Sequence, residues 1–124
     1  MNDRLFCQII DFFPYPIAIF TPQYNITLVN RAFETEIRRY ALDPGNEAIR
    51  ILLYKITDMQ LATGVTRVFA GDTFFLEDLK NPFAMFSGIT KQSATQPDRF
   101  HKAVIFPLSA DNKRITHGVI VFMP

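Results

Sequence analysis

Two short apolar segments joined by a polar turn and followed at once by an asparagine constrain the fold of this chain most strongly. Residues 16–20 and 26–29 are apolar and rich in β-branched side chains, and the five residues between them include proline and asparagine. This pattern predicts a β-hairpin. Asn30 follows directly, and its side-chain oxygen can accept a hydrogen bond from the free amides at the start of a helix. The apolar spacing after it predicts that helix over residues 31–41.

Periodicity elsewhere predicts an α+β domain with an antiparallel sheet and helices on one face. Residues 80–99 fit neither period and are expected to form a loop of about twenty residues, a length typical of lids and binding loops. Four apolar side chains in this loop are expected to pack on the rest of the molecule: Phe83, Met85, Phe86 and Ile89. The other predicted elements are helices over 3–13, 49–56 and 59–70, and strands over 73–79, 100–108 and 115–123.

Composition limits the classes of function. The chain has 124 residues, 48% of them hydrophobic, with thirteen phenylalanines, which indicates one ordered domain. A net charge of +1 makes nucleic acid an unexpected partner. No apolar run is long enough to cross a membrane, and the single cysteine, Cys7, fits a reducing compartment, so we expect a cytoplasmic location and no membrane contact by this segment.

The sequence offers no constellation for catalysis. His101, His117 and Cys7 lie on separate predicted elements, so no metal site is expected. Glu77 and Asp78 are adjacent on a predicted strand, so their side chains point to opposite faces and cannot form one acid–base pair. We therefore do not expect this chain to be an enzyme.

Three segments, taken in order, resemble a PAS domain, the sensory box module of bacterial signalling proteins. Residues 16–34 (PIAIFTPQYNITLVNRAFE) are similar to its opening strand, turn, strand and helix. Residues 68–73 (VFAGDT) resemble its connector helix entering the third strand, and residues 106–121 (FPLSADNKRITHGVIV) resemble its closing hairpin. Asn112 stands where many members carry glycine, and asparagine tolerates a left-handed turn.

The resemblance implies a five-stranded antiparallel sheet with helices packed on one face. It implies an N-terminal amphipathic dimerisation helix over residues 1–13 and a PAS domain over residues 14–124. It also implies a homodimer that senses a small ligand or relays a signal to an output domain after Pro124. That output would belong to a histidine kinase, a diguanylate cyclase (GGDEF) or a transcriptional regulator.

The resemblance also implies two candidate sites. The dimer interface would use the apolar face of the first helix, formed by Leu5, Phe6, Ile9, Ile10 and Phe13. A ligand pocket would be enclosed by helices and sheet, with three polar residues giving selectivity. Its candidate lining is Phe33, Ile37, Tyr54, Ile56, Val65, Thr66, Arg67, Phe69, Phe74, Leu76, Ile105 and Val119.

Departures from the family pattern bear on the cofactor. Members that bind flavin through a thiol use an Asn-Cys-Arg motif after the second strand, and this chain has no cysteine there. Haem-binding members supply a histidine from the connector helix, but residues 59–70 contain none. Haem and thiol-linked flavin are therefore disfavoured, and the identity of any cofactor stays open.

Two other functions remain open. A small cone-shaped α+β isomerase or dehydratase would need an inward carboxylate in an apolar pocket, and Asp78 is its best candidate. A pure interaction module would have a filled core and would signal only through its dimer surfaces. The inward stripe of a helix has the same pattern whether it packs on a sheet or on a ligand, so the pattern does not separate this module from a ligand sensor.

Overall fold

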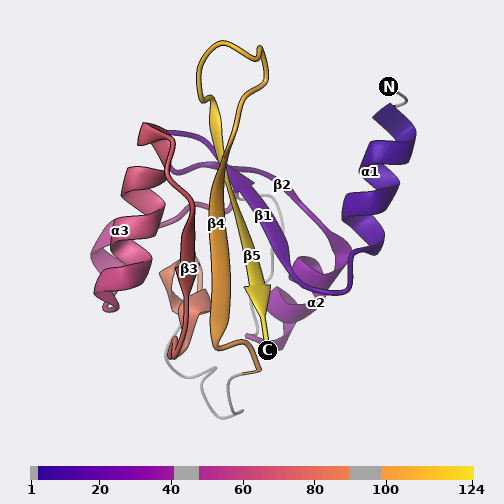
Figure 1. Cartoon of the computed structure of the whole chain (residues 1–124). Coiled ribbons are helices and arrows are strands. Elements are labelled where there is room, and N and C mark those ends of the chain that lie inside the picture. The colour runs from indigo at the N-terminus through magenta and orange to yellow at the C-terminus, as the bar shows by residue number, and fades with distance from the viewer. Residues whose placement is uncertain (1–2, 41–47, 90–98) are drawn as a thin grey trace.

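The computed structural model describes residues 3–40, 48–89 and 99–124. Five strands form one antiparallel sheet in the order β2-β1-β5-β4-β3, which confirms the predicted α+β architecture (Figure 1). The elements are α1 (Asp3–Phe12), β1 (Ile17–Phe20), β2 (Ile26–Val29), α2 (Arg31–Arg39), the 3₁₀ helix η1 (Leu53–Lys55), α3 (Met59–Arg67), η2 (Val68–Ala70), β3 (Phe74–Leu76), η3 (Pro82–Met85), β4 (Lys102–Leu108) and β5 (His117–Met123).

Asn30 joins the first hairpin to α2. Its Oδ1 accepts hydrogen bonds from the amides of Phe33, at 3.0 Å, and Ile17, at 2.9 Å. Its Nδ2 donates to the carbonyl of Tyr15 at 2.8 Å and to that of Phe13 at 3.4 Å. The predicted helix cap is therefore confirmed, and the same side chain also fixes the segment between α1 and β1.

The helix predicted over residues 49–56 is wrong. This segment is extended at its start, where bridges pair Asn25 with Arg50 and Ile51 with Phe86, and only η1 follows. The amide of Ile51 donates to the carbonyl of Tyr24 at 2.9 Å, and that of Leu52 donates to the carbonyl of Met85 at 2.8 Å. Hydrogen bonds to two distant segments thus satisfy backbone N–H and C=O groups that would otherwise pair within a helix.

The other predicted helices are present. Asp58 caps α3, and Gly71 ends η2 in the left-handed conformation at φ 105°. Asn112 has φ 60°, as its place in the closing turn requires. Strand β3 is shorter than predicted, because Asp78 has φ 56° and turns the chain out of the strand. In the part of the chain that is described, no helix has the length and apolar character needed to span a membrane.

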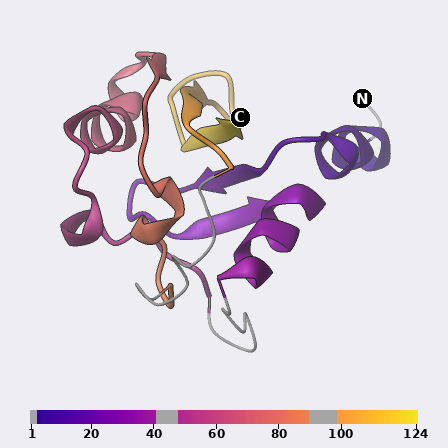
Figure 2. The same ribbon diagram turned by 90° about the horizontal axis from the view of Figure 1, so that it is seen from below.

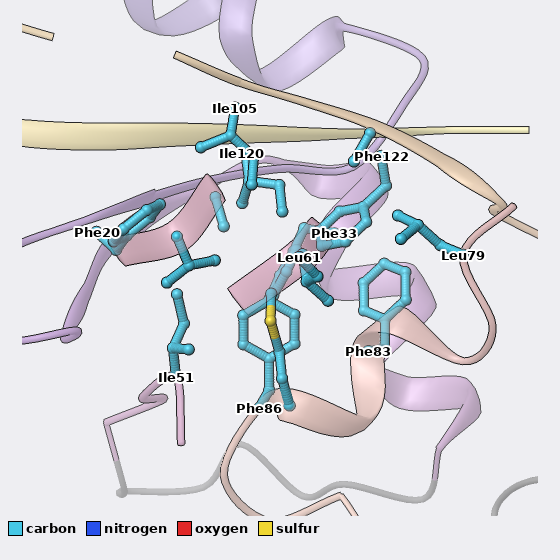
Figure 3. Close-up of a cluster of buried hydrophobic side chains, with 14 of the residues drawn as sticks. Phe20, Phe33, Ile51, Leu61, Leu79, Phe83, Phe86, Ile105, Ile120 and Phe122 are labelled. Atoms are coloured by element: carbon cyan, nitrogen blue, oxygen red, sulfur yellow. The ribbon is translucent and has the colours of Figure 1, made fainter. Parts of the chain in front are cut away.

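The two faces of the sheet carry separate apolar clusters. Alternate residues of the central strands point inward, among them Phe20, Ile105, Ile120 and Phe122, and pack with side chains of α2 and α3 (Figure 3). The intervening residues Ile17, Ile19, Val119 and Val121 form a cluster on the outer face. The described residues packed against this outer cluster come from the strands themselves and from Ile10 and Tyr15.

A segment that the sequence assigns to a loop enters the inner core. We call residues 80–89 the core loop; it contains η3, which lies between α3 and α2 in the view of Figure 2. The predicted packing of its apolar residues is confirmed, because Phe83, Met85, Phe86 and Ile89 are at most 4% exposed. The rest of the predicted loop, residues 90–98, lies outside the described residues.

Candidate functional site

Phenylalanine rings fill the space between the sheet and the helices. The rings of Phe83 and Phe122 are 4.3 Å apart between centroids, those of Phe33 and Phe86 are 5.1 Å apart, and those of Phe33 and Phe83 are 5.8 Å apart (Figure 3). Two of the four, Phe83 and Phe86, belong to the core loop. The region in which the sequence places a ligand pocket is therefore occupied by the protein's own side chains.

Most of the predicted pocket residues lie in or against this inner cluster. Five are almost completely buried: Phe33, Ile37, Val65, Leu76 and Ile105. Three more are partly buried and pack against the cluster: Ile56, Phe69 and Phe74. These eight side chains belong to or pack against the inner cluster, so the faces of α2, α3, β3 and β4 that carry them are turned toward the core.

The other four predicted pocket residues lie elsewhere. Val119 belongs to the outer cluster, because the register of β5 turns Ile120 and Phe122 inward instead. Arg67 and Thr66 are exposed, and the hydroxyl of Thr66 donates to the carbonyl of Ala62 at 2.8 Å within α3. Tyr54 is 82% exposed. Thr66 and Arg67 therefore do not point into the inner core, where the predicted ligand contacts would have been.

A cavity of about 370 Å³ opens at the edge of the core, between the entry to α3 and the core loop. Two of its residues, Tyr54 and Ile56, are among the predicted pocket residues, and the others are not, because the cavity depends on how the core loop folds back against residues 54–61. The first wall is formed by Tyr54, Lys55, Ile56, Thr57, Asp58 and Leu61, and the second by Lys80, Asn81, Pro82, Ala84, Met85 and Ile89.

A carboxylate on α2 is also buried. Glu36 is 4% exposed, and its Oε1 lies 3.6 Å from a guanidinium nitrogen of Arg39 and 3.8 Å from one of Arg99. Burial raises the pKa of Glu36 above its ordinary value, and the two arginines act in the opposite direction. The contact with Arg99 connects α2 to the segment that leads into β4, whereas the contact with Arg39 lies within α2.

Helix α1 stands beside the β2 edge of the sheet, away from α3 (Figure 1). Arg31 Nε and Asp11 Oδ2 are 2.7 Å apart, which ties α1 to α2. Of the predicted dimer residues, Ile10 is half-buried against the outer cluster of its own chain. Leu5, Phe6, Ile9 and Phe13 are exposed, and Phe12, which the prediction did not include, is 66% exposed.

The candidate residues for catalysis or metal binding do not lie together in one site. Asp78 is exposed, so the inward acid required by a cone-shaped isomerase is not at this position. Cys7 is exposed on α1, His101 contacts the carbonyl of Leu79, and His117 contacts Thr116. Within the described ranges, no group of three or more His, Cys, Asp and Glu side chains is placed to hold a metal ion.

Comparison with known proteins connects this architecture to a fold. No family model matches the sequence, and no curated protein matches it. Among solved structures, the PAS domain of BvgS from Bordetella pertussis is similar, with a TM-score of 0.57 and 16% sequence identity. The match covers 98% of this chain and 86% of that one. Together with the strand order and the helices on one face, this likeness shows that the chain has the PAS fold.

Proposed function

We propose that this chain is the sensory and dimerisation module of a larger cytoplasmic bacterial signalling protein. Two copies would pair through α1 and the outer face of the sheet. Changes in that pairing would pass to an output domain following Pro124, in a histidine kinase, a diguanylate cyclase or a transcriptional regulator.

The observation that carries this proposal is the exposed apolar face of α1. Ile9 is 61% exposed and Leu5 is 55% exposed. On the neighbouring outer face of the sheet, Val104, Phe106 and Met123 are half-buried around a buried apolar cluster. Soluble domains seldom expose contiguous apolar surface of this kind unless it binds a partner. The two surfaces adjoin at Ile10, so a second copy could cover both.

The filled inner core gives a second reason to place signalling at the surface. Phe33, Phe83, Phe86 and Phe122 are each at most 1% exposed and contact one another directly. A ligand could enter this space only by displacing rings from it. A signal carried by the dimer surfaces requires no such displacement.

Sedimentation equilibrium of residues 1–124 tests the dimer. We expect the unmodified protein to dimerise, and Ile9→Glu to weaken dimerisation by about tenfold or more, because an unpaired carboxylate would be buried in an apolar interface. Gln8→Glu is the matched control, since it adds the same charge to the same helix at an exposed residue facing the groove beside β2.

Either of two results would contradict the proposal. One is an unmodified protein that stays monomeric at high micromolar concentration. The other is equal weakening by Ile9→Glu and Gln8→Glu, which would mean that net charge rather than the apolar face of α1 governs association.

A further inference from the structure

The cavity beside α3 exists because the core loop folds back against the chain. One wall is residues 54–61, and the other is residues 80–89. Two hydrogen bonds join these parts of the chain. The backbone amide of Leu52 donates to the carbonyl of Met85, and the side-chain Nζ of Lys55 donates to the carbonyl of Ile89 at 2.9 Å. Its volume of about 370 Å³ falls within the range of about 300–1,000 Å³ typical of small-molecule sites.

The lining of this cavity is mostly apolar. Ile56, Leu61, Pro82, Met85 and Ile89 contribute side chains from both walls. Such a surface favours a ligand with an aliphatic or aromatic body, since burying that body removes apolar area from water. Leu61 and Met85 also belong to the inner core cluster, so a ligand resting on them would contact the same cluster as the phenylalanine rings.

The charged groups of the lining favour a single negative charge on the ligand. Lys55, Lys80 and Asp58 line the cavity, which gives the lining a net charge of +1. The carboxylate of Asp58 already accepts from the amides of Gln60 and Leu61. Among the described residues, no ion pair within 4.0 Å joins Lys55 or Lys80 to a carboxylate. Lys55 Nζ donates one N–H to the carbonyl of Ile89 and has two more to donate, so an anion could pair with both ammonium groups without displacing a carboxylate.

We propose that this cavity binds a small amphipathic monoanion, with an apolar body against Ile56, Leu61 and Met85 and one carboxylate at Lys80 and Lys55. The inference deepens the proposed sensory function by naming the class of ligand. The proposed site lies at the edge of the inner core, whereas the sequence predicts a pocket in the interior that the rings fill. Because the core loop supplies one wall of the cavity and two rings of the core, ligand binding acts directly on the packing of the domain.

Octanoate is a suitable probe, and octanol, which has the same chain without the charge, is its neutral partner. Isothermal titration calorimetry at pH 7 and low salt gives the affinities, and amide NMR shifts locate the site. We expect saturable binding of octanoate with shifts at Ile56, Leu61 and Met85. Lys80→Gln is expected to weaken octanoate binding by about three- to fivefold, as for a solvent-accessible ion pair, and to leave octanol binding unchanged.

Two further variants complete the design. Lys113→Gln, in the turn between β4 and β5, removes the same charge outside the cavity and is expected to have no effect on binding. Ala84→Leu places a larger side chain in the lining and is expected to abolish binding of both probes. If Ala84→Leu does not fold, the comparison of Lys80→Gln with Lys113→Gln still decides the question.

Several results would overturn the proposal. These are non-saturable binding of octanoate, shifts confined to the outer face of the sheet, or equal effects of Lys80→Gln and Lys113→Gln. The outcome is independent of the dimer test, since a monomeric protein that binds octanoate would contradict only the proposed dimer. A dimer that does not bind octanoate would contradict only the proposed ligand site.

Discussion

At the scale of single residues, Asn30 connects more parts of the fold than any neighbour in sequence. Its oxygen accepts from α2 and β1, and its nitrogen donates to the segment that follows α1. The side chain is fully buried, so none of these hydrogen bonds can be replaced by bulk water. The sequence revealed the cap because capping is local, whereas the bonds to Phe13, Tyr15 and Ile17 depend on how α1 and β1 approach the helix.

We predict that Asn30→Ala lowers the free energy of unfolding by about 2–4 kcal/mol, because it removes a cap and leaves buried backbone groups unpaired. Asn30→Asp is expected to be destabilising as well, since it keeps an oxygen acceptor but loses the two donor bonds and buries a charge. Urea denaturation followed by circular dichroism measures both. A loss of under about 0.5 kcal/mol in either variant, typical of an exposed site, would contradict this account.

At the scale of elements, the core loop and the segment before η1 show where local patterns stop being informative. Ile49, Leu52, Leu53 and Ile56 have helical spacing, yet the chain there pairs with Tyr24 on one side and with Met85 on the other. The apolar residue that becomes most deeply buried is Ile51, which is not in that stripe. Long-range pairing overrides helical periodicity in this segment, and no short window of sequence contains both partners.

The burial of Phe83, in the core loop, predicts how much a substitution there lowers the stability of the domain. Phe83 is 1% exposed and has ring contacts with Phe33, Tyr40, Phe86, Phe100 and Phe122. We predict that Phe83→Ala lowers the free energy of unfolding by about 3–5 kcal/mol, the usual cost of removing a buried phenylalanine. Urea denaturation measures this, and a rise in melting temperature with benzene would report the apolar cavity left behind.

Phe75→Ala is the matched control for Phe83→Ala, because Phe75 lies on β3 and is 78% exposed. The same chemical change is expected to alter stability there by no more than about 0.5 kcal/mol, as for most surface substitutions. Equal destabilisation by the two substitutions would mean that the core loop does not fill the core. Phe83→Ala protein that is unaffected by benzene would mean that the structure collapses around the missing ring.

At the scale of the whole molecule, the sequence predicts the order of the five strands and of three of the four helices, but it does not predict correctly which residues of β5 face the core. The hairpin, the capped helices and the alternating strands are local patterns, and their order led to the PAS resemblance that the structure confirms as a fold. The sequence pattern predicts Val119 on the inner face, whereas its neighbours Ile120 and Phe122 occupy that face. Both faces of β5 are apolar, so only its pairing with β1 and β4 decides which side is inside.

Sequence patterns also do not indicate that Lys55 and Lys80 line one cavity. Lys55 and Lys80 are separated along the chain, and the cavity that they share is created by the fold of the core loop. Gly118 is a similar case, since a Cβ there would lie 2.6 Å from the ring of Phe20. In both cases the residues that come together lie far apart in the sequence, and no local sequence pattern links their segments.

An apolar outer face left uncovered by helices has a consequence for the stability of the whole molecule. If dimerisation covers the exposed face of α1 and the half-buried residues Val104, Phe106 and Met123 on the outer face of the sheet, the melting temperature must rise with protein concentration, because association stabilises only the folded state. For a domain of this size, a hundredfold increase in concentration is expected to raise the melting temperature by about 3–6 °C. Ile9→Glu should remove most of this dependence, whereas Gln8→Glu, which adds the same charge to α1 at a residue facing the groove beside β2, should preserve it. Scanning calorimetry at several concentrations measures the effect, and a melting temperature independent of concentration in the unmodified protein would show that no second copy covers the exposed face of α1.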